Sequence, residues 1–255
     1  MPVAVVTPPV PLLVFDFDGV LVDGMVEYWW SARRAVLSLR PGLDLPEQAP
    51  AGFARLRPLI HKGWEMVLIA AELARADLDL TALLHGYQQA LAQALARWGW
   101  QPDQLQEALE QQRHRAIAAD PERWLGLHRF YPGVAERLGR LAHEGVPWLV
   151  LTTKGGGFAA QLLAAQGLQP LAVYGHEQGP KPVVLERLLK RGQPLWFVED
   201  RRPTLEAVRA VPALEAVRCY LVSWGYLGPR DGENLPPGIR WLEPEAFAAP
   251  LAAWP

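Results

Sequence analysis

Two aspartates close an apolar run near the start of the chain. Residues 12–20 read LLVFDFDGV, so Asp16 and Asp18 follow apolar residues and precede Gly19. In an extended strand residues i and i+2 point the same way, so the two carboxylates can share one site while Phe17 packs into the core. One carboxylate can attack phosphorus, and the other can give a proton to the leaving oxygen and later take one from water. The spacing therefore suits a nucleophile paired with a general acid and base.

Similar polar residues close or follow the later apolar runs. In chain order they are Thr152, Thr153 and Lys154, then Lys181 in GPKP, then Glu199 and Asp200. Ligands of open parallel α/β sheets bind outside the carboxyl ends of the strands. We therefore expect one rim of a sheet to gather carboxylates, a hydroxyl and an ammonium group.

Carboxylates crowded at one rim need a partner of opposite charge. Mg²⁺ is the natural partner, because it accepts carboxylate and backbone carbonyl oxygens and keeps waters for a substrate phosphate. Lys181 and Thr152 are then expected to face the phosphate. The sequence predicts a magnesium-assisted phosphoryl site.

Short apolar runs alternate with helical patterns in the parts of the chain that carry these residues. We expect strands within residues 11–17, 146–153, 171–175, 194–200 and 217–224. Helical patterns occupy residues 133–145, 158–167, 183–192 and 204–211. Strands that alternate with helices of this length imply crossover connections, so the predicted fold is α/β with a doubly wound parallel sheet.

A long helical insertion interrupts this alternation. Residues 25 to about 127 contain no convincing strand, and their helix-length amphipathic stretches are 25–39, 53–76, 81–98 and 102–118. Proline and glycine separate these stretches. We expect residues 1–24 and 128–255 to form the α/β core domain and residues 25–127 to form a separate all-helical domain.

Composition limits the classes of partner and the cellular compartment to be expected. The chain has 255 residues, half of them hydrophobic, and a formal charge of −2. Lys and Arg are scattered among the acids, so a nucleic-acid partner is not expected. No apolar stretch approaches the ~18 residues of a membrane span, and the first residues lack the pattern of a signal peptide. The single cysteine, Cys219, fits a reducing compartment, so we expect a cytoplasmic protein. We expect it to be a monomer or a homodimer.

Four segments in this order carry a family resemblance. DFDGVLVD, LTTK, Lys181 in GPKP and VEDRR resemble the four motifs of the haloacid dehalogenase (HAD) superfamily. YPGV, ahead of the second motif, is similar to the same point in the phosphoglycolate phosphatase and β-phosphoglucomutase branches. The resemblance spans the whole chain and implies a Rossmann-like core with an α-helical cap. It also implies hydrolysis of a small phosphorylated metabolite through an aspartyl phosphate, with Mg²⁺ as cofactor.

The resemblance assigns a role to each motif residue. It makes Asp16 the nucleophile and Asp18 the general acid and base, which also binds magnesium through its backbone. It makes Thr152, Thr153, Gly19 and Lys181 phosphate-site residues, Lys181 also steadying the nucleophile, and makes Asp200 a magnesium ligand. Two positions depart from the pattern, because Glu199 replaces a frequent glycine and Thr204 replaces a second acid. Glu199 as a replacement metal ligand and Glu199 as a structural residue both stay open.

Other functions remain in competition. A phosphomutase shares the same core and keeps the phosphoryl group from water. A dehalogenase needs no metal and no acid two residues after the nucleophile, so Asp18 argues against it. A catalytically silent binding protein would retain the fold alone. Specificity is expected from the cap, whose candidate polar contacts are Arg33, Arg34, Arg57, His61 and Lys62.

Overall fold

A computed structural model describes residues 9–255, and the chain divides into two compact units. One unit contains the described residues up to Leu21 together with Phe130–Pro255, and the other is Val22–Arg129. The predicted limits of the helical domain, 25 and 127, fall inside the second unit.

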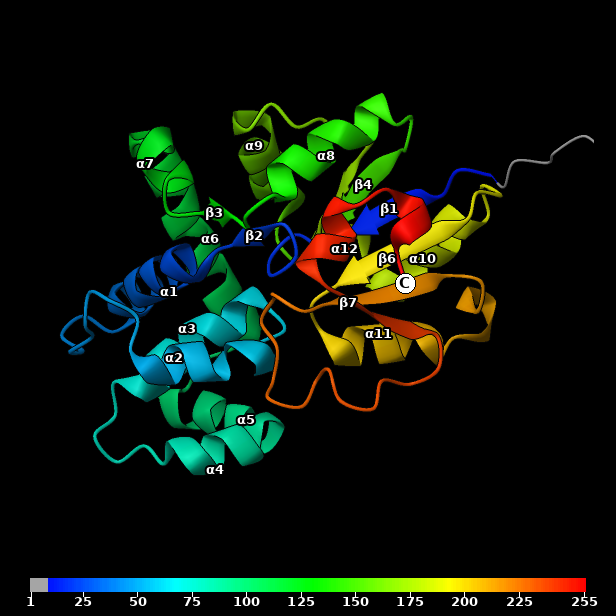
Figure 1. The fold of residues 1–255 in the computed structure, drawn as a ribbon. Helices are drawn as coiled ribbons and strands as arrows, with labels where there is room; N and C mark the ends of the chain where they lie inside the picture. Colours follow the sequence, from blue (N-terminus) through cyan, green and yellow to red (C-terminus); the bar gives the residue numbers. More distant parts are fainter. Residues whose placement is uncertain (1–8) are drawn as a thin grey trace, which may run out of the picture. The chain divides into compact units, whose positions relative to one another are not determined.

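The first unit is built on a sheet of six strands in the order β5-β4-β1-β6-β7-β8. Figure 1 labels β4, β1, β6 and β7 of this sheet. All neighbouring strands are parallel. The strands are β1 (Leu12–Phe15), β4 (Trp148–Leu151), β5 (Val173–Tyr174), β6 (Leu195–Glu199), β7 (Arg218–Val222) and β8 (Ile239–Leu242). The first strand of the chain thus lies in the middle of the sheet, and strand order reverses there. The α/β fold with a doubly wound parallel sheet is confirmed.

Helices cover both faces of this sheet (Figure 1). They are α8 (Val134–His143), α9 (Gly156–Ala165), α10 (Lys181–Leu189), α11 (Arg202–Arg209) and α12 (Pro244–Ala248). On one face, leucines of α10 and α11 pack with Leu12 and Val14. On the other, Phe247 of α12 meets Phe15 edge to face at 6.1 Å. Because successive strand residues point to opposite faces, a strand covered on both sides must be apolar throughout, as LLVF is.

The strand β8 was not among the predicted strands. It is an edge strand, paired only with β7, and it presents exposed Arg240 between buried Ile239 and Leu242. An edge strand is less buried than a central one, so its sequence lacks the continuous apolar run used to find the others.

The second unit is helical. Its helices are α1 (Met25–Leu39), α2 (Ala51–Leu56), α3 (Gly63–Leu73), α4 (Leu80–His85), α5 (Tyr87–Trp98), α6 (Pro102–Ala119) and α7 (Pro121–Leu125). No strand occurs between Met25 and His128, all of which the structure describes, as predicted. Two short strands, β2 (Val22–Asp23) and β3 (Arg129–Phe130), pair with each other where the chain leaves and re-enters the first unit.

Two predicted helical stretches are each divided. Residues 53–76 form α2, a 3₁₀ turn at Arg57–Leu59 and α3, because Pro58 has no N–H to continue an α-helix. Residues 81–98 form α4 and α5, which meet at Gly86 with φ −113° and ψ 35°. Glycine imposes little conformational preference, so the helix breaks there at low cost.

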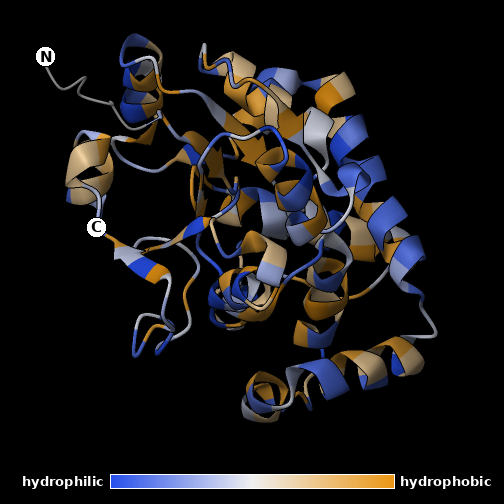
Figure 2. Ribbon diagram, turned by 90° about the vertical axis from the view of Figure 1, so that its right-hand side faces the viewer, coloured by the Kyte–Doolittle hydropathy of each residue, from blue (hydrophilic) through white to orange (hydrophobic). Residues whose placement is uncertain are grey.

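The helices α1, α3 and α6 pack together as the core of this unit. The middle of α3, Met66–Ala71, is buried on every side. An ion pair joins α1 to α6 inside this core, where the Arg113 guanidinium donates to both Glu27 carboxylate oxygens at 2.7 and 2.8 Å. Figure 2 shows hydrophobic and hydrophilic residues alternating along the helices, the amphipathic pattern that such packing requires. Within residues 9–255, no helix is both long and apolar enough to cross a bilayer.

Candidate active site

The carboxyl end of β1 places Asp16 in the middle of the sheet's rim. The Asp16 N–H still donates to the Val198 carbonyl oxygen of β6 at 2.9 Å, so Asp16 extends the strand by one residue. Phe17 is fully buried, as expected, and its N–H donates to Asp16 Oδ1 at 2.8 Å. The chain then turns, with the Leu21 N–H bonded to the Phe17 carbonyl oxygen. Asp16 is therefore held rigidly by the sheet and by its own turn.

Lys181 joins the ends of β1 and β6. It is the first residue of α10, and its Nζ lies 2.9 Å from Asp16 Oδ1 and 2.7 Å from Glu199 Oε2. All three side chains are buried. Charged groups buried together must pair, so the ammonium group fixes the position of both carboxylates.

Glu199 already has protein partners on both carboxylate oxygens. Oε2 accepts from Lys181, and Oε1 accepts the N–H groups of Asp200 and Arg201 at 3.2 and 3.1 Å. Its side chain is therefore engaged in holding Lys181 and the turn after β6. This favours the structural alternative for Glu199 over a role as metal ligand.

Asp200 is closely surrounded at the rim by the Asp16 and Glu199 carboxylates, the Tyr226 N–H and Gly19. Its carboxylate lies in one group with those of Asp16 and Glu199, in which one oxygen from each residue lies within 4.8 Å of the others. Oδ2 accepts the Tyr226 N–H at 2.8 Å. Gly19 has φ +89°, and a Cβ there would lie 1.9 Å from Asp200 Oδ2. Only glycine leaves room for this carboxylate to approach the turn after β1.

The end of β4 brings Lys154 to Asp18. Lys154 is only 5% exposed, and its Nζ lies 3.4 Å from Asp18 Oδ1. Thr152 is buried at the same turn, and its Oγ1 accepts the Lys154 N–H at 3.0 Å. Thr153, predicted as a phosphate-site residue, is exposed, and its side chain makes no hydrogen bond to the other predicted residues within 9–255.

Sequence reasoning gave no role to Lys154 or to the loop after β7. The signal was present for both. Lys154 follows Thr153 in the quoted segment LTTK, and SWGY at 223–226 follows the strand next to β6. Since all carboxyl ends of parallel strands reach the same rim, every polar or glycine-containing segment just after a strand was a candidate.

Opposite charges do not balance at this rim. Four carboxylates and two ammonium groups lie at this rim, which gives a formal charge of −2 when all are ionised. The carboxylates are those of Asp16, Asp18, Glu199 and Asp200, and the ammonium groups are those of Lys154 and Lys181. Burial, and then the Glu199 charge, raise the pKa of Asp16 to about 8, while Lys181 opposes the rise. Burial likewise raises the pKa of Glu199. Burial opposes the charge of Lys181, but Asp16 and Glu199 outweigh it and raise the pKa of its ammonium group.

A divalent cation fits these residues. The surplus charge is −2, and the donors are carboxylate oxygens, the ligands that hard cations such as Mg²⁺ prefer. Asp16 and Asp200 would hold the ion. The Phe17 and Lys181 contacts of Asp16 both fall on Oδ1, whereas both carboxylate oxygens of Glu199 have protein partners.

If Asp16 is a magnesium ligand, the affinity for magnesium should depend on pH. The pKa of Asp16, about 8, lies above its ordinary value, so below pH 8 a cation must displace a proton from this carboxyl group. Calorimetry on chelator-treated protein should show Mg²⁺ affinity rising about tenfold per pH unit below pH 8 and levelling off above it. About one proton should be released per ion, and none in Asp16→Asn. An affinity independent of pH from about 6 to 9 contradicts the assignment.

The protein is an α/β protein with a parallel sheet. A buried aspartate follows its central strand, a lysine contacts that aspartate, and further acids follow the neighbouring strand. A family model for haloacid dehalogenase-like hydrolases matches residues 10–211, and the chain belongs to this family. A search of curated proteins finds no match.

Solved structures resemble the chain over nearly its whole length. A predicted phosphoglycolate phosphatase from Haemophilus somnus 129PT is 20% identical over 94% of this chain and 95% of its own, with a TM-score of 0.60. A hydrolase from Pseudomonas syringae is 19% identical over 93% and 95%, with a TM-score of 0.55. A candidate β-phosphoglucomutase from Thermotoga maritima is 17% identical over 93% and 96%, with a TM-score of 0.54. At these identities the likeness establishes the shared fold.

Proposed function

We propose that this protein is a magnesium-dependent phosphomonoester hydrolase that acts on a small phosphorylated metabolite. The observation that carries the proposal is the buried contact of 2.9 Å between Lys181 Nζ and Asp16 Oδ1 at the carboxyl end of the central strand. An ammonium group there neutralises the charge that otherwise repels a phosphate from a carboxylate nucleophile. The family membership and the named relatives support the same reaction class.

The first half-reaction forms an aspartyl phosphate. An Asp16 carboxylate oxygen attacks phosphorus, the bond from phosphorus to the ester oxygen breaks, and Asp18 gives that oxygen a proton. Lys181 and Thr152 stabilise the phosphoryl oxygens. When bound, Mg²⁺ supplies further charge stabilisation at the phosphoryl group.

The second half-reaction regenerates the enzyme. Water attacks phosphorus and gives a proton to the Asp18 carboxylate, the bond to Asp16 breaks, and inorganic phosphate leaves. Lys154, 3.4 Å from Asp18, holds that carboxyl group at the rim in both steps. We further propose that residues 25–127 serve as the cap that selects the metabolite.

Asp18→Asn is expected to slow turnover by a factor on the order of 10² to 10⁴, because proton transfer is lost while the nucleophile remains. The loss should shrink as the leaving group improves, since a stable phenolate departs without protonation. Rates for a series of aryl phosphates measure this dependence. An equal loss for every leaving group would remove Asp18 from the role of general acid.

A screen over phosphorylated metabolites, with and without magnesium, tests the function as a whole. Release of inorganic phosphate that depends on Asp16 supports the hydrolase. Formation of an isomeric phosphate ester without phosphate release would identify the phosphomutase instead. Binding of a metabolite with no product of either kind would identify the catalytically silent alternative.

A further inference from the structure

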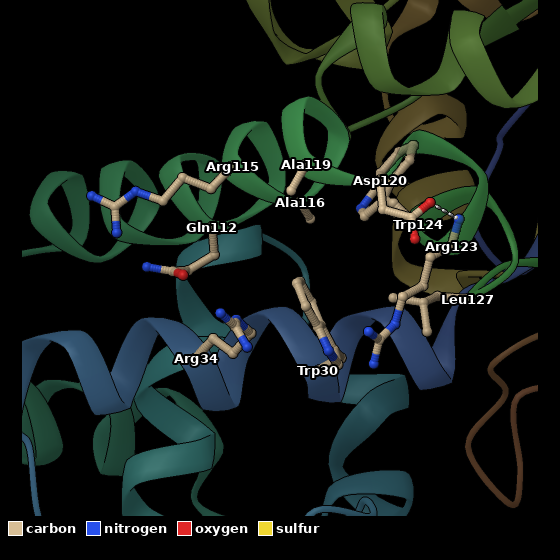
Figure 3. Close-up of a pocket in the computed structure, with 10 residues that line it drawn as sticks. All are labelled: Trp30, Arg34, Gln112, Arg115, Ala116, Ala119, Asp120, Arg123, Trp124 and Leu127. Carbon is tan, nitrogen blue, oxygen red and sulfur yellow. Dashed lines mark hydrogen bonds between the residues drawn. The ribbon is translucent and has the colours of Figure 1, made fainter.

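The helical unit contains a cavity of about 310 Å³ between α1 and α6–α7 (Figure 3). Figure 3 shows Trp30 rising from α1 toward α6, with Arg34 beside it on α1 and Gln112 on α6. Arg123 reaches from α7 toward α1. The volume is that of a site for a small organic molecule. Every lining residue lies in this unit, and none is a residue of the sheet's rim. Arg34, a candidate substrate contact from the sequence, lines this cavity.

The cavity carries an excess of positive charge. Three arginines line it, Arg34, Arg115 and Arg123, against one carboxylate, that of Asp120. Asp120 caps α7, and its Oδ1 accepts the backbone N–H of Arg123 at 3.0 Å. In the described part of the chain, none of the three guanidinium groups has an ion-pair partner. An anion in the cavity would meet guanidinium groups whose donors are not committed elsewhere.

A flat apolar surface accompanies this charge. The Arg34 guanidinium carbon lies 4.7 Å from the centre of the Trp30 ring, a cation–π contact that holds the indole in place. Trp124 and Leu127 supply further apolar wall. A planar ring bound against Trp30 would gain stacking as well as burial.

A buried amide marks the cavity as polar at one end. Gln112 is only 5% exposed, yet it lines the cavity, and its side chain makes no hydrogen bond to any residue in 9–255. The amide atoms of Gln112 are therefore reached from the cavity and are free to hydrogen-bond to a bound molecule. A ligand with a polar edge would supply that partner.

We infer that this cavity binds a small organic anion with a planar ring, whose ring lies on Trp30 and whose anionic group is held by Arg34 and Arg123. The anionic group is a phosphate or a carboxylate. Gln112 hydrogen-bonds to a polar atom of the same ligand. This ligand is distinct from the phosphomonoester proposed as substrate, and its binding requires none of the residues at the sheet's rim.

Calorimetry with three probes tests the inference: adenosine monophosphate, 1-naphthoate and inorganic phosphate. The measurements use Asp16→Asn protein so that no probe is consumed. One of the two ring-bearing probes is expected to bind with one-to-one stoichiometry and more tightly than inorganic phosphate. Binding of the nucleotide alone assigns the anionic group as phosphate, and binding of naphthoate alone assigns it as carboxylate.

Variants locate the bound probe. Arg123→Ala and Gln112→Leu should each weaken binding at least about tenfold, because each removes donors to the ligand. The matched control is Arg55→Ala, which removes the same charge from an exposed position of α2 outside the cavity and should bind as the parent does. Arg123 is also exposed, so its variant keeps the test valid if Gln112→Leu does not fold.

Three results would overturn the inference. The first is no binding of either ring-bearing probe at millimolar concentration. The second is binding that the cavity variants leave unchanged but that Thr152→Val abolishes, which would place the probe at the catalytic rim. The third is inorganic phosphate that binds as tightly as the ring-bearing probes.

Discussion

Replacing Asp16 with asparagine is expected to reduce the hydrolysis of every phosphomonoester to the uncatalysed background. The amide cannot attack phosphorus, and the substitution also removes a proposed magnesium ligand. Loss of a covalent nucleophile costs a factor on the order of 10⁴ to 10⁶ in turnover. Phosphate release from an aryl phosphate, followed over hours at high protein concentration, measures the residual rate.

The substitution should leave the fold intact, because asparagine has nearly the same volume and its amide oxygen can still accept from Lys181. The matched control is Asp79→Asn, the same chemical change at an exposed residue that caps α4. The control should hydrolyse as the wild type does. Residual activity in Asp16→Asn within about tenfold of the wild type would remove Asp16 from the role of nucleophile.

Removal of divalent metal should have the second largest effect. With all four carboxyl groups ionised, as they must be for Asp16 to attack, the two ammonium groups leave a formal charge of −2 that repels a phosphate dianion. A chelated protein should therefore lose a factor of about 10³ or more in turnover. Activity should return on addition of Mg²⁺ in excess of the chelator. The rate as a function of free Mg²⁺ measures the effect.

Asp200→Asn tests metal binding while leaving the proposed nucleophile and its lysine contact in place. Since Asp200 lies with Asp16 in the carboxylate group and does not contact Lys181, its variant should need more Mg²⁺ for the same rate. Glu199→Gln should shift the metal requirement less, because Glu199 is engaged with Lys181 and two backbone N–H groups. Full activity after exhaustive chelation would contradict a metal-dependent reaction.

The central strands could be predicted from the sequence, because a strand buried on both faces is a continuous run of apolar residues. LLVF at β1 and WLVL at β4 are continuous apolar runs, and both are strands buried at every residue. The edge strand β8 has no continuous apolar run, since Arg240 faces solvent, and it could not be predicted in this way. Residues 53–76 were predicted as one helix because their apolar residues recur with helical spacing. Pro58, which has no N–H to donate, divides this stretch into α2 and α3.

The candidate site followed from the sequence only where a residue ends a strand and belongs to a recognisable motif. Asp16 satisfies both conditions. Lys181 begins α10 rather than ending a strand, and only its motif pointed to Asp16, which it contacts at 2.9 Å. The contact of Lys154 with Asp18 depends on how deeply the turn after β4 is buried, which spacing does not show. The sequence could not decide whether Glu199 is a metal ligand or a structural residue. Its hydrogen bonds to Lys181 and to the Arg201 N–H favour the structural role, and they are known only from the three-dimensional arrangement.

Trapping the phosphorylated enzyme tests the central proposal most directly. Asp18→Asn protein, acid-quenched during turnover of an aryl phosphate that needs no protonation, should accumulate the intermediate because water attack lacks its base. Mass spectrometry should find one phosphoryl group on the peptide that contains both aspartates, and borohydride reduction should convert Asp16 to homoserine. Sustained product formation with no phosphoryl group on Asp16, or with the group on another residue, would contradict the covalent mechanism proposed for this site.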